Sequence, residues 1–187
     1  MSKIKQPEPV KLIIGMFSNK IELFEEVKKI LEKKYSQIDF VSGILPFSKT
    51  DYYEKEMGKD LKRIFYSFEK LINPEDLAEI KIFTNSVEEK FSIKDNQQTC
   101  PPKRRVNIDP GYLTLSKLVL ASTKDYSHRV YLKEGIYAEA TLRFKDGTFI
   151  PYEYTYPDYR TQEYLNIFNQ IRQIYHTNLS SIHKSET

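Results

Sequence analysis

VKLIIGMF, residues 10–17, is an apolar run that predicts a mostly buried β-strand. The residues after it favour an amphipathic helix, because Asn19 and Glu22 have the spacing of a capping box and apolar residues recur at helical intervals. Residues 38–47 and 61–71 are rich in strand-forming residues and predict two further strands. The chain is therefore expected to begin with a strand, a helix and two strands.

A second helix is the most distinct element of the sequence. NPED, residues 73–76, supplies an N-cap asparagine, a proline at the first helical position and two acids near the positive end of the helix dipole. An apolar stripe continues from there to Phe91. Residues 106–108 predict a short strand that ends in a turn at DPGY, residues 109–112. The order strand, helix, strand, strand, helix, strand predicts a ferredoxin-like split βαβ unit.

The rest of the chain predicts a β-meander and a C-terminal helix. YLTLSKLVLAST, residues 112–123, fits both the helical and the strand period, and its length and lysine placement favour a short helix. Residues 128–132, 136–144 and 148–155 predict three strands joined by tight turns. Thr161 can cap the final helix. The predicted fold class is α+β.

A polar, proline-containing linker at residues 94–103 is the one plausible boundary within the chain. It separates two candidate subdomains, residues 9–93 and 104–178. Each part alone would have a thin hydrophobic core, so we expect a single domain over residues 1–187 that is built from both.

Composition excludes several common kinds of site. The six glycines are spread so widely that no Gly-rich nucleotide loop and no G-x-S-x-G elbow is present. A single cysteine excludes an internal disulfide and a multi-cysteine metal site within a monomer. A net charge of +3 is too small to indicate nucleic-acid binding by itself. No apolar run approaches the roughly 18 residues of a membrane span, and no signal peptide is evident, so we expect a cytoplasmic protein.

Three segments carry a resemblance to a known family: NIDPGYLTLSKLVLASTKDYSHRVYL at 107–132, FSKTDYYEKEMG at 47–58 and TYPDYR at 155–160. On these segments the chain resembles a family of small prokaryotic proteins that is catalogued as a domain of unknown function. The resemblance covers nearly the whole chain. It implies no activity, cofactor or catalytic residue.

Basic residues outnumber acidic ones between Lys103 and Arg129, and tyrosines are interleaved with them. Arginine and lysine hold phosphate groups and tyrosines stack on bases, so this stretch predicts binding of an anionic, phosphorylated ligand such as RNA or a nucleotide. A solvated charged surface around a linker explains the same residues. The candidate ligand-binding residues are Arg104, Arg105, Lys117, Lys124, Tyr126, Arg129 and Arg160.

KDYSHR, residues 124–129, concentrates more hydrogen-bonding side chains than a plain turn requires and is the first candidate site. His128 could act as a general base that Asp125 orients, although a lone histidine is more often structural. If a strand begins at His128, the side chains of His128 and Arg129 point to opposite faces unless a bulge intervenes.

Two further functions are left open by the sequence. Asp109, Asp125, His128 and Glu139 could hold magnesium or manganese, which would favour a metal-assisted phosphoester hydrolase, although their spacing fits no known signature. Tyr152, Tyr154 and Tyr156 lie at the strand period and could form a protein-interaction face, or pack against a helix. The sequence does not indicate the identity of a cofactor or the oligomeric state.

Overall fold

The computed structural model describes residues 3–48, 53–93 and 103–185. These residues form nine strands, four α-helices and two short 3₁₀ helices. The strands are β1 (Lys11–Ser18), β2 (Ile38–Val41), β3 (Leu45–Pro46), β4 (Lys62–Phe68), β5 (Asn107–Leu113), β6 (Lys117–Ser122), β7 (Val130–Lys133), β8 (Ile136–Lys145) and β9 (Thr148–Pro151). The helices are α1 (Glu22–Lys34), α2 (Glu54–Met57), η1 (Pro74–Asp76), α3 (Leu77–Phe91), η2 (Pro157–Arg160) and α4 (Gln162–Ser185).

The predicted ferredoxin-like unit is confirmed. Strands β2, β4, β1 and β5 are neighbours in that order and every pair is antiparallel, with α1 and α3 as the two crossover helices. This is the strand order of a split βαβ unit. The start of the second helix also follows the sequence pattern, because the Asn73 backbone N–H donates to Asp76 Oδ2 at 3.1 Å in a capping box.

The predicted meander extends the same sheet. Beyond β5 the order continues as β6, β8 and β7, and β9 pairs with β8. The predicted linker at 94–103 falls between α3 and β5, inside the ferredoxin-like unit, and all of it except Lys103 lies outside the described residues. No helix in the described ranges is long and apolar enough to cross a membrane.

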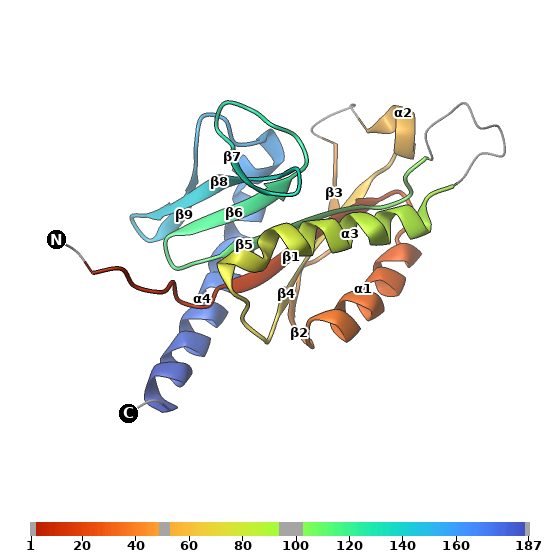
Figure 1. Cartoon of the computed structure of the whole chain (residues 1–187). Helices are drawn as coiled ribbons and strands as arrows, with labels where there is room; N and C mark the ends of the chain where they lie inside the picture. The colour runs from red at the N-terminus through yellow and green to blue at the C-terminus, as the bar shows by residue number, and fades with distance from the viewer. Residues whose placement is uncertain (1–2, 49–52, 94–102, 186–187) are drawn as a thin grey trace.

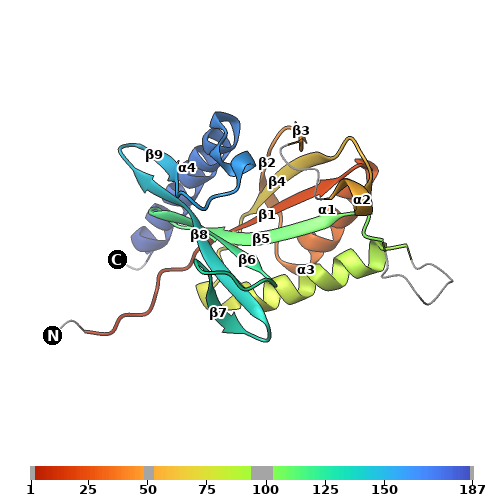
Figure 2. The same cartoon turned by 90° about the horizontal axis from the view of Figure 1, so that it is seen from above.

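Both faces of the sheet are covered, which explains the continuous apolar run in β1. Leu12, Ile14 and Met16 point to the core under α1 and α3, whereas Ile13 points to the core under α4. Figures 1 and 2 show α3 and α4 on opposite sides of the sheet. A strand that is buried on both faces needs apolar residues at every position rather than at alternate ones.

The prediction of a helix at 112–123 is wrong. This segment contains the end of β5, a turn in which the Thr114 N–H donates to Lys117 O at 2.8 Å, and β6. Leu118 and Leu120 point to one core, whereas Val119 and Ala121 point to another, which is strand periodicity. The leucine spacing was compatible with both structures, and the pairing of β6 with β8 decides for the strand.

The prediction of a turn at 109–112 is also wrong. These residues lie inside β5, where Asp109 pairs with Gly15 and Pro110 pairs with Ile14 of β1. Proline is tolerated in a strand where one side of the strand has no partner. Asp-Pro-Gly is a frequent turn sequence, but here the pairing with β1 keeps it extended.

Four smaller expectations also need correction. Helix α1 begins at Glu22 without a side-chain cap, and Ser18 Oγ rather than Asn19 accepts the Lys20 N–H. The strand expected at 38–47 is divided into β2 and β3. The strand expected at 148–155 ends at Pro151, and the one expected at 128–132 begins at Val130.

The sheet opens between β5 and β6. In the described part of the chain, these strands pair at Gly111–Leu113 alone, after which β5 keeps its pairing with β1 and β6 keeps its pairing with β8. Gly111 stands where the two strands approach most closely: a Cβ there would lie 2.4 Å from the Val119 carbonyl oxygen. From Gly111 back toward Asn107 in β5, and from Leu120 onward in β6, the two strands no longer pair. The space between them there is a pocket.

Candidate functional site

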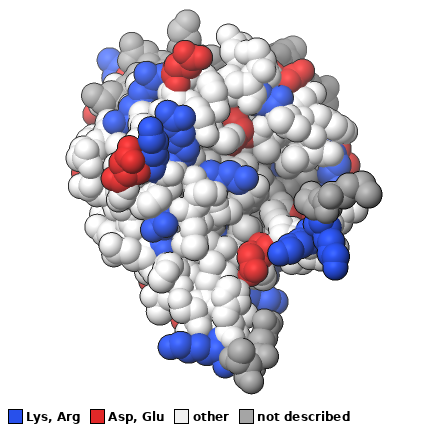
Figure 3. Space-filling model, turned by 90° about the vertical axis from the view of Figure 1, so that its left-hand side faces the viewer, with Lys and Arg blue, Asp and Glu red and all other residues white. Residues whose placement is uncertain are grey.

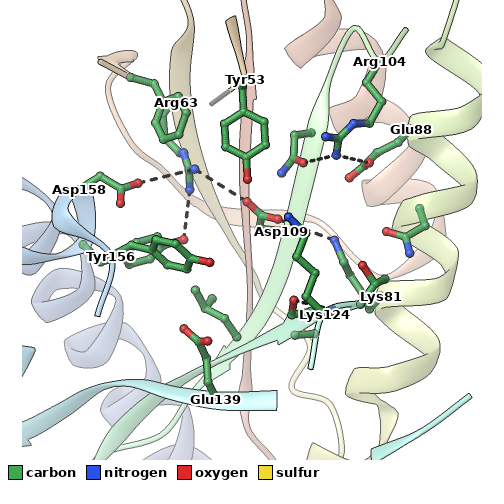
Figure 4. Close-up of a pocket in the computed structure, with 18 of the residues that line it drawn as sticks. Tyr53, Arg63, Lys81, Glu88, Arg104, Asp109, Lys124, Glu139, Tyr156 and Asp158 are labelled. Carbon is green, nitrogen blue, oxygen red and sulfur yellow. Dashed lines mark hydrogen bonds and ion pairs between the residues drawn. The ribbon is translucent and has the colours of Figure 1, made fainter. Parts of the chain in front are cut away.

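The pocket between the diverging strands has a volume of about 610 Å³. Small-molecule sites commonly enclose about 300–1,000 Å³. Because the sheet is open here, side chains from α3 on one face and from η2 on the other reach the same space (Figure 4). Its described lining carries five basic and five acidic residues: Arg63, Lys81, Arg104, Lys124 and Arg129, and Glu88, Glu89, Asp109, Glu139 and Asp158.

Arg63, on β4, lines the pocket and is only 3% exposed. Its guanidinium lies over the rings of Phe17 and Phe47, at 4.9 and 4.6 Å from their centroids. Nη1 donates to the Tyr159 hydroxyl at 3.1 Å. Burial works to lower the pKa of Arg63, but the surrounding tyrosines and carboxylates more than offset this effect and raise it. Arg63 is therefore a fixed positive charge in a nearly dry environment.

Two aspartates flank the Arg63 guanidinium. Nη2 lies 3.8 Å from Asp109 Oδ2 and 3.7 Å from Asp158 Oδ2. Burial raises the pKa of Asp158, although Arg63 opposes this shift. Figure 4 shows the Tyr53 hydroxyl pointing toward Asp109. Burial, together with the Asp109 charge, raises the pKa of Tyr53 to about 12.

Lys81, on α3, approaches Asp109 from the other face of the sheet. Its Nζ donates to the Ile108 carbonyl at 2.8 Å and lies 3.7 Å from Asp109 Oδ1. Asp109 therefore stands between two buried cations, Arg63 and Lys81. Acidic and basic side chains therefore alternate along the base of the pocket, which we call its floor, in the order Asp158, Arg63, Asp109 and Lys81.

Glu88 lies two helical turns after Lys81, on the same face of α3, and is also buried. Its Oε1 accepts the Ile108 N–H at 2.6 Å, and its Oε2 lies 3.7 Å from Arg104 Nη1. Arg104 in turn donates to both carboxylate oxygens of Glu56 at 2.7 Å. Burial raises the pKa of Glu88 to about 7, against the opposing effects of Lys81 and Arg104. This carboxyl group therefore changes charge near neutral pH.

Glu139, on β8, holds the segment before β7. Arg129 Nε donates to Glu139 Oε2 at 2.7 Å, and His128 Nε2 lies 3.0 Å from the same oxygen. Arg129 Nη2 also donates to the Tyr156 hydroxyl at 3.2 Å. His128 stacks on Tyr154 with a centroid distance of 4.2 Å. His128 and Arg129 converge on one carboxylate because they precede β7 and do not follow strand alternation.

The chain matches the model of the family described as Domain of unknown function (DUF4416) over residues 8–175. It belongs to the DUF4416 family. The matched span includes the whole pocket lining, from Phe47 to Tyr159. No curated protein and no solved structure matches this chain.

Three of the ligand-binding residues predicted for this DUF4416 protein, Arg104, Lys124 and Arg129, line the pocket. The other four lie outside its lining. Lys117 stands at the opposite end of β6, and Tyr126 is 67% exposed. Arg160 donates to the Thr155 and Glu153 carbonyls, and the Arg105 carbonyl accepts the Ser18 hydroxyl.

The residues predicted to act as a base or to hold a metal are divided in the same way. Asp109 and Glu139 line the pocket, whereas Asp125 is exposed and His128 faces Glu139 from outside the lining. Within the described ranges, no group of three or more His, Cys, Asp or Glu residues is placed to hold a metal ion. The hydrolase and the protein-interaction module stay predictions.

Arg63, Lys81 and Glu88 are not among the residues predicted from the sequence. Arg63 lies in β4, KRIFYSF, on the face opposite the alternating Ile64, Tyr66 and Phe68, and it is buried because β4 is covered on both faces. Lys81 and Glu88 are seven residues apart on α3 and therefore share one helix face. A charged residue on the buried stripe of α3 was the available signal for Lys81 and Glu88.

Proposed function

We propose that the pocket binds a small phosphorylated molecule of nucleotide size. The observation that carries this proposal is a pocket of about 610 Å³ whose lining brings the basic side chains of Arg104, Lys124 and Arg129 together around one space, with the guanidinium of Arg63 at its base. Arginine offers five N–H donors and keeps its charge when buried, and it is over-represented where phosphate or carboxylate is recognised. Arg63 itself donates to Tyr159 and lies within ion-pair distance of Asp109 and Asp158, so the phosphate is assigned to the other cations of the lining.

The cations nearer the mouth suit the phosphate. Figure 4 shows Lys124 extending from the end of β6 across the pocket in the direction of Asp109, with Arg104 on the far wall. The Lys124 charge also contributes to lowering the pKa of Glu56, although the hydrogen bond from Arg104 is the main cause. When Glu88 is protonated, the lining gains net positive charge, which favours an anion further.

The balance of charges favours a small molecule over a polymer. Acidic and basic residues alternate in the lining, so a ligand needs hydrogen-bond donors as well as an anionic group. On the face seen in Figure 3, Lys and Arg are scattered among Asp and Glu instead of forming one stripe. RNA recognition relies on extended basic surfaces, so of the two predicted ligands a nucleotide fits better.

Calorimetric titration of nucleoside mono-, di- and triphosphates into the protein tests this proposal. Lys124→Gln should weaken binding of the tightest of them roughly tenfold, because it removes one charge-assisted contact to phosphate. Lys117→Gln is the matched control, since it removes the same charge at the other end of β6, outside the pocket lining. Its affinity should equal that of the parent.

Salt and a single-stranded RNA complete this experiment. Phosphate contacts release counterions, so the affinity should fall between about 50 and 200 mM salt. Absence of nucleotide binding even at low salt would contradict the proposal. Binding of the RNA alone, with equal loss in both lysine variants, would move the function from the pocket to the basic surface.

A further inference from the structure

At the base of the pocket, the Arg63 guanidinium lies beside two carboxylates without a direct hydrogen bond to either. Arg63 Nη2 lies 3.8 and 3.7 Å from the nearest oxygens of Asp109 and Asp158. An N–H···O hydrogen bond needs about 2.7–3.2 Å between the heavy atoms. Arg63 Nε is buried and has no hydrogen-bond partner among the described residues. The Arg63 guanidinium and the Asp109 and Asp158 carboxylates are therefore close enough to share a ligand group but too far apart for direct hydrogen bonds.

The arrangement selects among ligand groups by charge. A phosphate or carboxylate next to Arg63 would also face Asp109 and Asp158, and these like charges would repel it. An ammonium group would meet Arg63 itself. A hydroxyl group is suited to both, because it accepts from a guanidinium and donates to a carboxylate at the same time.

We propose that Arg63, Asp109 and Asp158 bind neighbouring hydroxyl groups of the ligand's sugar. This inference rests on the proposed function, which supplies a phosphorylated ligand of nucleotide size. One hydroxyl bridges Arg63 and Asp109, and the next bridges Arg63 and Asp158. The ligand class is therefore a ribose-containing or similar sugar phosphate with adjacent free hydroxyls.

The orientation of the ligand follows from the same residues. The sugar lies on the floor, where Arg63 and Asp158 are buried, and the phosphate lies toward Lys124 and Arg104. Tyr53 and Tyr159 also line the pocket and provide apolar ring surface for the sugar carbons. In this orientation the two aspartates and Arg63 bind the hydroxyl groups, and Lys124 and Arg104 bind the phosphate.

The test compares ribose 5-phosphate with 2-deoxyribose 5-phosphate by calorimetric titration at low salt. Removing one hydroxyl leaves a buried charged group without its partner, so the deoxy compound should bind at least about tenfold more weakly. Asp158→Asn should bring the two affinities close together, while inorganic phosphate binds the variant no more weakly than it binds the parent. Asp125→Asn, the same change at an exposed position outside the pocket lining, should leave the preference intact.

The outcomes separate this inference from the proposed function. Equal affinity of the parent for both sugar phosphates overturns the inference and leaves phosphate binding in place. Binding of methyl β-ribofuranoside without any response to phosphorylated probes overturns the proposed function and supports the hydroxyl site. If neither kind of probe binds, both are wrong. The comparison in the parent protein holds even if Asp158→Asn fails to fold, and Asp109→Asn then serves as the second variant.

Discussion

Arg63→Met should destabilise the protein by about 3–5 kcal/mol near pH 7, because it leaves the buried carboxylate of Asp158 without its cation and removes one of the two cations beside Asp109. Asp158 and Asp109 both lie within ion-pair distance of Arg63 Nη2. Methionine keeps an unbranched side chain against Phe17 and Phe47, so the lost charge rather than lost volume dominates. Urea unfolding of parent and variant measures the difference.

The dependence on pH separates charge from packing in this experiment. Burial raises the pKa of Asp158 and Arg63 opposes this shift, so in the variant protonation of Asp158 should remove uncompensated charge and the deficit of Arg63→Met should shrink as the pH falls from 7 toward 4. Arg143→Met is the control, since Arg143 is exposed on β8 and should cost little. A deficit that stays constant with pH would mean that the guanidinium acts through packing alone.

Glu88→Gln should change how stability depends on pH. Burial raises the pKa of Glu88 from 4.5 to about 7, so between these values the native state holds a proton that the unfolded state has lost. The free energy of unfolding therefore falls as the pH rises through this window, by about 3 kcal/mol for this group. Glutamine has no proton to lose and keeps an oxygen for the Ile108 N–H. The variant should gain about that much relative to the parent between pH 4.5 and pH 8.

Unfolding of both proteins in urea at several pH values measures this gain, and the difference between them cancels the other titrating groups. Glu89→Gln is the matched control, because Glu89 is the next residue and its side chain is exposed. It should leave stability nearly unchanged across the range. A parent and a Glu88→Gln variant with parallel pH profiles would show that Glu88 is ionised in the folded protein throughout.

The fold was predictable from local signals where those signals were unambiguous. The NPED start of the second helix and the doubly buried β1 run each had one physical interpretation, and together they indicated the ferredoxin-like order. Residues 112–123 had two interpretations, because leucines at 113, 115, 118 and 120 fit both periods. The neighbouring strand β8 decides between them, and pairing between distant strands cannot be derived from the segment itself.

The site was predictable only in part, for a related reason. Arg104, Lys124 and Arg129 belong to a visibly basic stretch and do line the pocket. Arg63, Lys81 and Glu88 belong to elements whose patterns indicate core, and they meet only because β5 and β6 diverge beyond Gly111. No pattern within either segment predicts that divergence. The divergence depends on the pairing of β5 with β1 and of β6 with β8, which joins segments that are distant in the sequence.

The most direct measurement of the central claim is a crystal structure of this protein with ribose 5-phosphate. The expected result is a ligand between β5 and β6, with its hydroxyl groups against Arg63, Asp109 and Asp158 and its phosphate toward Lys124 and Arg104. A ligand bound outside this pocket, for example at the exposed Lys117 end of β6, with the pocket side chains unchanged, would contradict it.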